Sequence, residues 1–197
     1  KFFDERLFIN ISKLYYVCRC IDDIADNVKE TINSEQELTQ LQIDFDKNNI
    51  DNDIVSIFYS IENKVSKKHI LKLIDGVKSD INFTPYETTD QLLNYCHKVA
   101  GVVGIMFCEI LGIDDNNALI KANDLGIAMQ LTNIMRDIFE DANMGRVYLP
   151  HELFGRINPY DINIQNKDVV DNIYSEKIDQ IYNICLLYTS DAADDAN

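Results

Sequence analysis

The sequence predicts a single all-α domain, and three observations support that prediction. Apolar residues recur at helical rather than alternating spacing along most of the chain. Only 7 Gly and 3 Pro occur in 197 residues, fewer than a fold of many short strands and turns requires. The apolar content of 46% is typical of a globular protein, and the chain is long enough to bury one hydrophobic core.

The first helix is expected at the very start of the chain. The opening KFFDERLF is already in a helical pattern, which continues through Ile11, Leu14, Val17 and Ile21 to about Lys29. No initiator Met precedes it. We therefore expect the sequence to begin inside a helix, in a bundle that is truncated at this end.

Three shorter helices are expected next. Ser34 and Glu37 have the spacing of a capping box, in which each side chain accepts a hydrogen bond from a free backbone N–H. The second helix should therefore begin after Ser34 and end at a polar break over residues 44–53. Two more helices are expected over residues 54–64 and 66–79.

A long apolar helix follows and is expected to be central. Thr88 and Gln91 form a second capping-box pattern, and the helix should end near Gly112. Gly101 and Gly104 lie inside it, where each costs up to about 1 kcal/mol relative to Ala. Either a neighbouring helix packs closely against these glycines or a ligand needs the space, and the sequence leaves both open.

Residues 124–150 are expected to form an amphipathic helix that runs into a loop. Their sequence is DLGIAMQLTNIMRDIFEDANMGRVYLP. At 3.6 residues per turn one narrow polar stripe holds Gln130, Asn133, Asp137 and Asp141. The opposite face holds Leu131, Ile134, Met135 and Ile138. The loop beyond the helix presents Arg146 and Tyr148, and loops often carry binding groups.

The crowded carboxylates of this helix allow two interpretations. Asp137, Glu140 and Asp141 place three negative charges in little more than one turn, and like charges at this spacing weaken a helix. The stretch is either a solvated acidic face or a site for something positive. Asp75 and Asp80, near the end of an earlier helix, are expected to be a solvated pair.

A second acidic stripe in the first helix favours a cation site. Tyr15, Arg19, Asp22 and Asp26 follow the i, i+4, i+7, i+11 spacing and share one helix face. Two such helices facing each other would surround a divalent metal ion with carboxylate oxygens. Mg²⁺ prefers such ligands together with substrate phosphate oxygens, and Mn²⁺ is an alternative.

The charge and the cysteines exclude several classes of function. A net charge of −15 would repel a nucleic-acid backbone, so an anionic substrate should arrive together with metal ions. The five cysteines include no C-x-x-C pair, which argues against a disulfide framework or a structural zinc site. Neither a signal peptide nor a membrane span is expected, and we expect a cytoplasmic protein, with peripheral membrane contact for product release left open.

The C-terminal part carries less information. Residues 156–171 are polar, and a final helix is expected over residues 169–184. The tail at 185–197, CLLYTSDAADDAN, has no periodicity, and residues 185–194 match the translation of a transposase sequencing adapter. We therefore interpret residues 1–184 as a partial domain and residues 185–197 as a non-native tail.

Three strings together resemble one enzyme family. CRCIDDIAD, YCHKVAGVVG and QLTNIMRDIFEDANMGRVYLP are similar to the squalene and phytoene synthases, and the last is most similar to the bacterial phytoene synthases. The resemblance implies an isoprenoid-synthase helical bundle, truncated at both ends, whose metal ions bind the diphosphates of prenyl donors. By that resemblance the metal ligands are Asp22, Asp26, Asn133, Asp137 and Asp141.

The resemblance also implies the roles of further residues and the reaction. Arg19, Arg136 and Arg146 look like diphosphate contacts, and the remaining pocket residues are Tyr15, Tyr95, Val99, Ala100, Gln130 and Tyr148. The four carboxylates and Tyr148 are the implied catalytic groups. The implied reaction joins two geranylgeranyl diphosphates head-to-head through a cyclopropyl diphosphate. NADPH is implied only if the product is squalene.

Other functions remain open at this point. The same fold could make dehydrosqualene or squalene from farnesyl diphosphate, because chain length is not readable from these motifs. A di-iron bundle would need Glu-x-x-His pairs, and none of the three His follows a Glu at that spacing. A non-catalytic acidic helical module that binds a basic partner is the remaining alternative. The oligomeric state is not readable from the sequence.

Overall fold

The computed structural model describes residues 4–26, 31–62 and 65–162. All regular structure within these residues is helical, so the predicted all-α class is confirmed. The elements of the first half are α1 (Glu5–Asp26), α2 (Thr31–Lys47), α3 (Asp53–Tyr59) and α4 (Lys67–Ile81). The second half contains α5 (Thr89–Cys96), a π-helix (His97–Gly101), α6 (Val102–Ile110), α7 (Asn116–Arg136), α8 (Ile138–Asn143), α9 (His151–Phe154) and a 3₁₀ turn (Pro159–Asp161).

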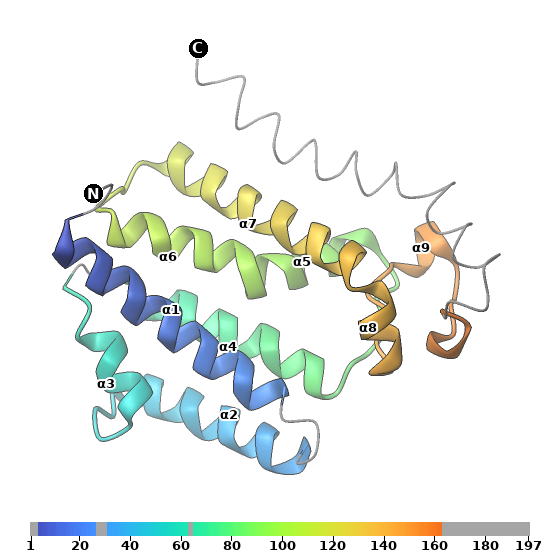
Figure 1. The fold of residues 1–197 in the computed structure, drawn as a ribbon, viewed down its shortest axis with the longest axis horizontal. Coiled ribbons are helices and arrows are strands. Elements are labelled where there is room, and N and C mark those ends of the chain that lie inside the picture. The colour runs from blue at the N-terminus through green and yellow to red at the C-terminus, as the bar shows by residue number, and fades with distance from the viewer. Residues whose placement is uncertain (1–3, 27–30, 63–64, 163–197) are drawn as a thin grey trace.

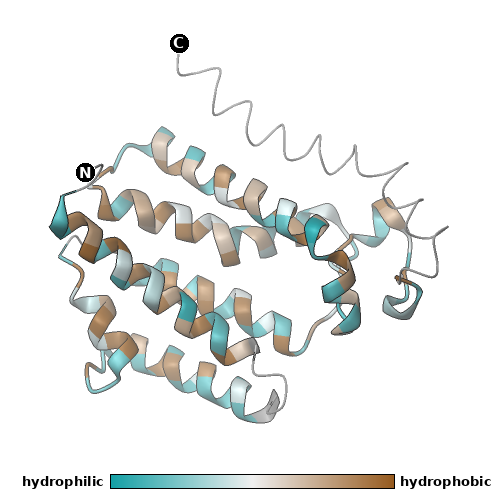
Figure 2. Ribbon diagram, viewed as in Figure 1, coloured by the Kyte–Doolittle hydropathy of each residue, from teal (hydrophilic) through white to brown (hydrophobic). Residues whose placement is uncertain are grey.

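The long helices lie roughly alongside one another in an ordered stack (Figure 1). Helix α4 packs against α1, α2 and α6, and α6 packs in turn against α7. The α5–α6 pair and the π-helix between them therefore connect α4 with α7. Figure 2 shows that α6 is mostly apolar along its length, as expected for a helix covered on several sides.

Two hydrophobic cores form within this stack. The first joins α1 to α4 with α6 and contains Leu14, Val17, Ile21, Leu38, Phe45, Ile70, Ile74 and Met106. The second joins α5, the later part of α7, α8 and the segment that follows it, and contains Leu92, Leu131, Ile134, Ile138 and Leu149. Val99 packs against both cores. The π-helix that carries Val99 is therefore the junction between the two halves.

Several expected boundaries in the first half are wrong. Helix α2 already begins at Thr31, so Ser34 is a buried residue inside the helix and not its N-cap. The expected break also begins later than Asp44, because α2 continues to Lys47. The Asp44 carboxylate accepts hydrogen bonds from the side-chain amides of Gln40, Asn49 and Asn52, which closes the turn into α3. The polar break is therefore shorter than the sequence predicted and spans residues 48–52, between α2 and α3.

The long central helix was predicted correctly at its start but not in its interior. Thr88 and Gln91 form the expected capping box at the start of α5. The helix then widens into the π-helix, where the Val102 N–H bonds to the His97 carbonyl. A Cβ at Gly101 would collide with the Asn123 side chain, and one at Gly104 with the backbone of Ala122. Close packing against α7 therefore explains both glycines.

The acidic helix is divided in two, and a short helix follows the loop. Helix α7 ends at Arg136, and α8 begins after a break at Asp137. Helix α9 was not predicted from the sequence. None of the helices in the described part of the chain is both long and apolar enough to cross a bilayer. The helix expected over 169–184 and the tail at 185–197 lie outside the described residues.

Candidate active site

Asp80, one residue before the end of α4, accepts hydrogen bonds from two buried tyrosines. The Tyr95 hydroxyl donates to its Oδ2 at 2.8 Å, and the Tyr148 hydroxyl donates to its Oδ1 at 2.7 Å. Each tyrosine is 6% exposed. The predicted solvated pair is therefore wrong for Asp80, because α5 and the segment after α8 cover it. Asp75, in contrast, is exposed and forms an ion pair with Lys98.

Four aromatic rings surround these hydrogen bonds. The rings of Tyr95 and Tyr148 stack with centroids 5.2 Å apart, and Tyr86 lies 5.7 Å from Tyr95. Phe83 meets Tyr148 edge-on at 5.0 Å. Burial, and then the charge of Asp80, raise the pKa of Tyr95 and of Tyr148, so both remain neutral phenols. The cluster presents ring faces and phenol oxygens in a water-poor setting.

Local structure holds both tyrosines in place. Tyr95 lies in the last turn of α5, whose start is fixed by its capping box. Tyr148 lies in the loop before α9, and the first residues of α9, directly after this loop, are tied to the α4–α5 connection by two backbone hydrogen bonds. The His151 N–H donates to the Tyr86 carbonyl at 2.9 Å, and the Glu152 N–H donates to the Glu87 carbonyl at 3.0 Å. The predicted binding loop is thus well fixed on the side that carries Tyr148.

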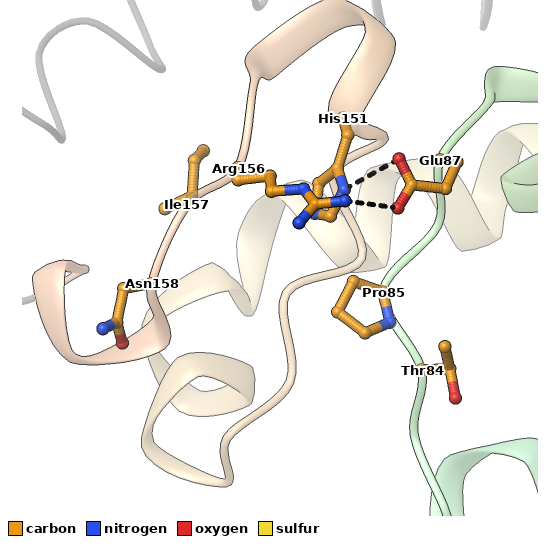
Figure 3. Close-up of a pocket in the computed structure, with 7 residues that line it drawn as sticks. All are labelled: Thr84, Pro85, Glu87, His151, Arg156, Ile157 and Asn158. Atoms are coloured by element: carbon orange, nitrogen blue, oxygen red, sulfur yellow. Dashed lines mark hydrogen bonds and ion pairs between the residues drawn. The ribbon is translucent and has the colours of Figure 1, made fainter.

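A pocket of about 440 Å³ lies beside these ties and is lined by Thr84, Pro85, Glu87, His151, Arg156, Ile157 and Asn158 (Figure 3). Glu87 forms ion pairs with His151 at 3.2 Å and with Arg156 at 3.4 Å. The basic side chains of the pocket, His151 and Arg156, therefore already have a carboxylate partner. The pocket lining includes none of the predicted site residues. We interpret it as part of the support of the loop.

The break between α7 and α8 preserves the spacing of the acidic stripe. Asp137 has φ −99° and ψ 14°, outside helical geometry. Its N–H nevertheless donates to the Asn133 carbonyl at 2.8 Å, and the Asp141 N–H donates to the Asp137 carbonyl at 2.9 Å. Asn133, Asp137 and Asp141 therefore stay on successive turns, as the sequence predicted.

The two carboxylates of this motif have opposite electrostatic environments. Burial, together with the charges of Asp137, Asp80 and Glu140, raises the pKa of Asp141 to about 6, although Arg146 opposes the shift. Hydrogen bonds from the Arg136 guanidinium lower the pKa of Asp137. The Arg136 Nε and Nη2 donate to the two carboxylate oxygens of Asp137 at 2.7 and 2.6 Å.

The first acidic motif lies on a more exposed face of α1. Tyr15 is 70% exposed, and Arg19 forms its ion pair with Asp23 at 2.8 Å. Asp22 is half-buried. Asp26 is the last residue of α1, and its side chain lies outside the described residues. The structure therefore places Tyr15, Arg19 and Asp22 on α1, but it does not test the complete motif.

The donor set of the second motif fits a hard divalent cation in part. Asp80 and Asp137 are each close enough to Asp141 for their charges to act on it, and all three supply oxygen. The raised pKa of Asp141 reflects negative charge that a cation would neutralise. Among the described side chains, however, no group of three His, Cys, Asp or Glu could hold a metal ion by itself. Further ligands would have to come from elsewhere, such as a substrate.

The remaining predicted pocket residues lie on the π-helix, on α7 and in the loop after α8. Val99 and Ala100 are half-buried residues of the π-helix. Gln130 is half-buried on α7 and accepts a hydrogen bond from the Asn133 amide at 3.5 Å. Arg146, also half-buried, lies near Asp141, whose pKa it lowers. Asp80, Phe83 and Tyr86 surround Tyr95 and Tyr148, and the sequence did not predict them as site residues.

Comparison with known proteins identifies the family. The family model for squalene/phytoene synthase matches residues 1–179. The chain belongs to this family. It is 37% identical to a 15-cis-phytoene synthase of Enterobacter agglomerans over 163 residues, which cover 76% of the chain and 55% of the relative. It is 34% identical to the 15-cis-phytoene synthase of Pantoea ananas over 164 residues, which cover 76% and 53%.

Solved structures of the squalene/phytoene synthase family share the fold. A squalene synthase from Alicyclobacillus acidocaldarius superposes with a TM-score of 0.67 at 25% identity, covering 90% of the chain and 70% of that structure. A dehydrosqualene synthase superposes with a TM-score of 0.60 at 22% identity, covering 96% and 76%, and supports the fold alone. The chain spans about half the length of the first curated relatives that it matches.

Proposed function

We propose that this chain forms the metal-binding and cation-stabilising part of a prenyltransferase that joins two geranylgeranyl diphosphates head-to-head, as a phytoene synthase does. The observation that carries the proposal is the buried Asp80–Tyr95–Tyr148 cluster next to Asp141, in a chain of the squalene/phytoene synthase family. The relatives named 15-cis-phytoene synthase support the choice of product.

The proposed metal ligands are the carboxylates of both acidic motifs together with the Asn133 amide. They are Asp22, Asp26, Asn133, Asp137 and Asp141. Bound Mg²⁺, or Mn²⁺ in its place, would neutralise diphosphate charge and make diphosphate a better leaving group. The half-buried Asp141 is suited to this role because its charge is poorly solvated and lies among other carboxylates, with Arg146 only partly opposing the rise in its pKa.

The proposed diphosphate contacts are Arg19, Arg136 and Arg146. A guanidinium group can bind two phosphate oxygens at once, which orients the substrate as well as neutralising it. Arg136 now binds Asp137 through two hydrogen bonds, and Arg19 binds Asp23. Both are exposed, so either could turn from its carboxylate to a substrate at little cost.

The aromatic cluster is proposed to face the carbocation. When the first C–O bond breaks, the electron pair leaves with diphosphate and positive charge remains on the prenyl chain. The positively charged carbon bonds to the double bond of the second donor, and loss of a proton closes the cyclopropane ring. Ring faces and phenol oxygens of Tyr95 and Tyr148 would stabilise this charge, and their hydrogen bonds to Asp80 increase the electron density on those oxygens. Their burial keeps water from reacting with the cation.

A second candidate function has one observation in its favour. The superposed structure at 25% identity is a squalene synthase. The same site would then join two farnesyl diphosphates, giving dehydrosqualene, or squalene if NADPH supplies a hydride. We further propose that the protein works in the cytoplasm and passes its apolar product to a membrane surface by peripheral contact.

Product analysis tests the proposal. The chain is incubated with Mg²⁺ and either geranylgeranyl or farnesyl diphosphate, with and without NADPH, and the products are identified by chromatography and mass spectrometry. Phytoene from geranylgeranyl diphosphate without NADPH is the expected result. A product that forms only from farnesyl diphosphate would replace the proposal with the second candidate. Release of diphosphate without carbon–carbon bond formation would contradict both.

A further inference from the structure

The π-helix is held between α4 and α7 by a chain of polar contacts centred on His97. The Lys72 Nζ on α4 lies 3.1 Å from the His97 Nε2, and the His97 Nδ1 lies 2.6 Å from the Asn123 Oδ1 on α7. Asn123 in turn donates from its Nδ2 to the Asp124 Oδ1 at 3.0 Å. Lys98, the next residue of the π-helix, pairs with α4 separately.

This chain of contacts fixes the tautomer of the His97 ring. A carboxylate only accepts hydrogen bonds, so the amide nitrogen of Asn123 must face Asp124 and its carbonyl oxygen must face His97. The hydrogen on the ring must therefore be on Nδ1. The Nε2 of His97 is then a bare acceptor, and the Lys72 ammonium donates to it. The His97 ring thus accepts a hydrogen bond from Lys72 and donates one to Asn123, which joins α4 to α7.

The backbone around His97 leaves little room for the π-helix to move. A Cβ at Gly76 on α4 would collide with the side chains of Lys98 and Val99. A Cβ at Gly126 on α7 would lie 2.5 Å from the Ala100 carbonyl oxygen. The π-helix is therefore in close contact with both helices. Single π turns inside α-helices often occur at functional sites, where they displace side chains from the regular spacing.

We propose that His97 is a positioning residue: its neutral ring, bridging Lys72 and Asn123, holds the π-helix so that Val99 and Ala100 face the substrate chain. The functional part of this inference rests on the proposed function, in which these two residues line the prenyl pocket. Val99 is well placed to report on it because it packs against both hydrophobic cores.

The first test is the tautomer itself. Long-range ¹H–¹⁵N spectra of the labelled chain distinguish a ring nitrogen that carries hydrogen from one that does not. The chain has three His, so the signal that disappears in His97→Asn is assigned to His97. We expect hydrogen on Nδ1 and a bare Nε2. Hydrogen on Nε2, or rapid exchange between the two forms, would overturn the proposal.

The second test uses a matched pair of variants. The side-chain nitrogen of Asn occupies the place of Nδ1, whereas that of Gln occupies the place of Nε2. His97→Asn should therefore keep the partly buried bond to Asn123 and lose only the exposed contact with Lys72, which leaves the Val99 methyl signals in place. His97→Gln should lose the bond to Asn123 and shift them. Asp90→Asn, a control at an exposed position in the first turn of α5, should leave Val99 unaffected. Equal behaviour of the Asn and Gln variants would refute a positioning role.

Kinetics separates this inference from the proposed function. With Mg²⁺ and geranylgeranyl diphosphate, His97→Gln should raise KM about tenfold with a smaller change in kcat, as expected from the loss of one partly buried hydrogen bond. His97→Asn should remain within about twofold of the native chain. If the native chain itself makes no product, the proposed function fails, while the tautomer and the Val99 signals still decide the role of His97.

Discussion

The two acidic segments have similar spacing in the sequence but different surroundings in the structure. On α1, Tyr15 and Arg19 are exposed and Asp22 is half-buried. At the α7–α8 break, Asp141 is close to other carboxylates and to a buried aromatic cluster, and its pKa is raised. The α1 segment can bind a ligand at little cost in desolvation. The second segment is destabilised by burial of its charge and by repulsion among its own carboxylates until a cation neutralises them.

The largest effect should come from removing one carboxylate of either segment. Asp137→Asn and Asp22→Asn should each lower turnover at least about a thousandfold, because each removes charge that would hold the metal ions. Circular dichroism should show unchanged helix content. Product formation is the measurement. Full activity in both variants would contradict the assignment of these carboxylates to the metal ions, and absence of product from the native chain as well would favour the non-catalytic acidic module.

The aromatic cluster beside the second segment should give the next largest effect. Asp80→Asn replaces one acceptor oxygen by an amide donor, so one of the two phenols loses its acceptor. We expect kcat to fall about a hundredfold with the protein still folded. Asp90→Asn, an exposed residue in the first turn of α5, is the matched control and should leave kcat unchanged. Equal kcat in the two variants would remove Asp80 from the site.

A pH effect on stability should distinguish the second segment from the first. The pKa of Asp141 is about 6 in the folded protein against 3.8 for the free side chain, so the folded state disfavours the charged form. The metal-free protein should therefore lose stability as pH rises from about 4 to about 6, by about 1 kcal/mol after allowance for solvent screening.

Urea unfolding at a series of pH values, with and without Asp141→Asn, measures this difference. The variant should be more stable than the native chain above pH 6, and the two should converge near pH 4. A variant that is less stable at pH 7 would contradict the assignment of a poorly solvated charge to Asp141.

The smallest effect should come from the exposed ion pair of the first segment. Arg19 and Asp23 are both more than half exposed, so Arg19→Ala should change the free energy of unfolding by less than about 0.5 kcal/mol. The same change should raise KM for the prenyl diphosphate, because Arg19 is a proposed diphosphate contact. Asp23→Ala is the control, and it should affect neither quantity. An unchanged KM in Arg19→Ala would remove Arg19 from the site.

The sequence was sufficient for the helical class and for the spacing of the acidic motifs. Helical periodicity is a property of the chain itself, and the stripe through Asn133, Asp137 and Asp141 persists because its backbone hydrogen bonds bridge the break. The break was not predictable, since it depends on how α8 packs in the second core. The π-helix was equally hidden, because close contacts with Gly76 and Gly126 belong to other helices.

Asp80 shows what the sequence interpretation missed. It lies three and seven residues after Val77 and Leu73, which are buried, so it falls on the apolar stripe of α4. A carboxylate on a buried stripe indicates a paired or functional group, and this signal was available. The identity of its partners was not, because Tyr95 and Tyr148 reach it only through the packing of α5 and of the loop before α9.

The most direct test of the account is whether the two acidic segments act on one ligand. A double-mutant cycle with Asp22→Asn and Asp137→Asn would measure Kd for a non-hydrolysable prenyl thiodiphosphate in the presence of Mg²⁺ by calorimetry. If both segments hold the same metal–diphosphate group, the double variant should bind hardly more weakly than the weaker single variant. If the two losses in affinity multiply as independent effects, the segments bind separately and the shared site is contradicted.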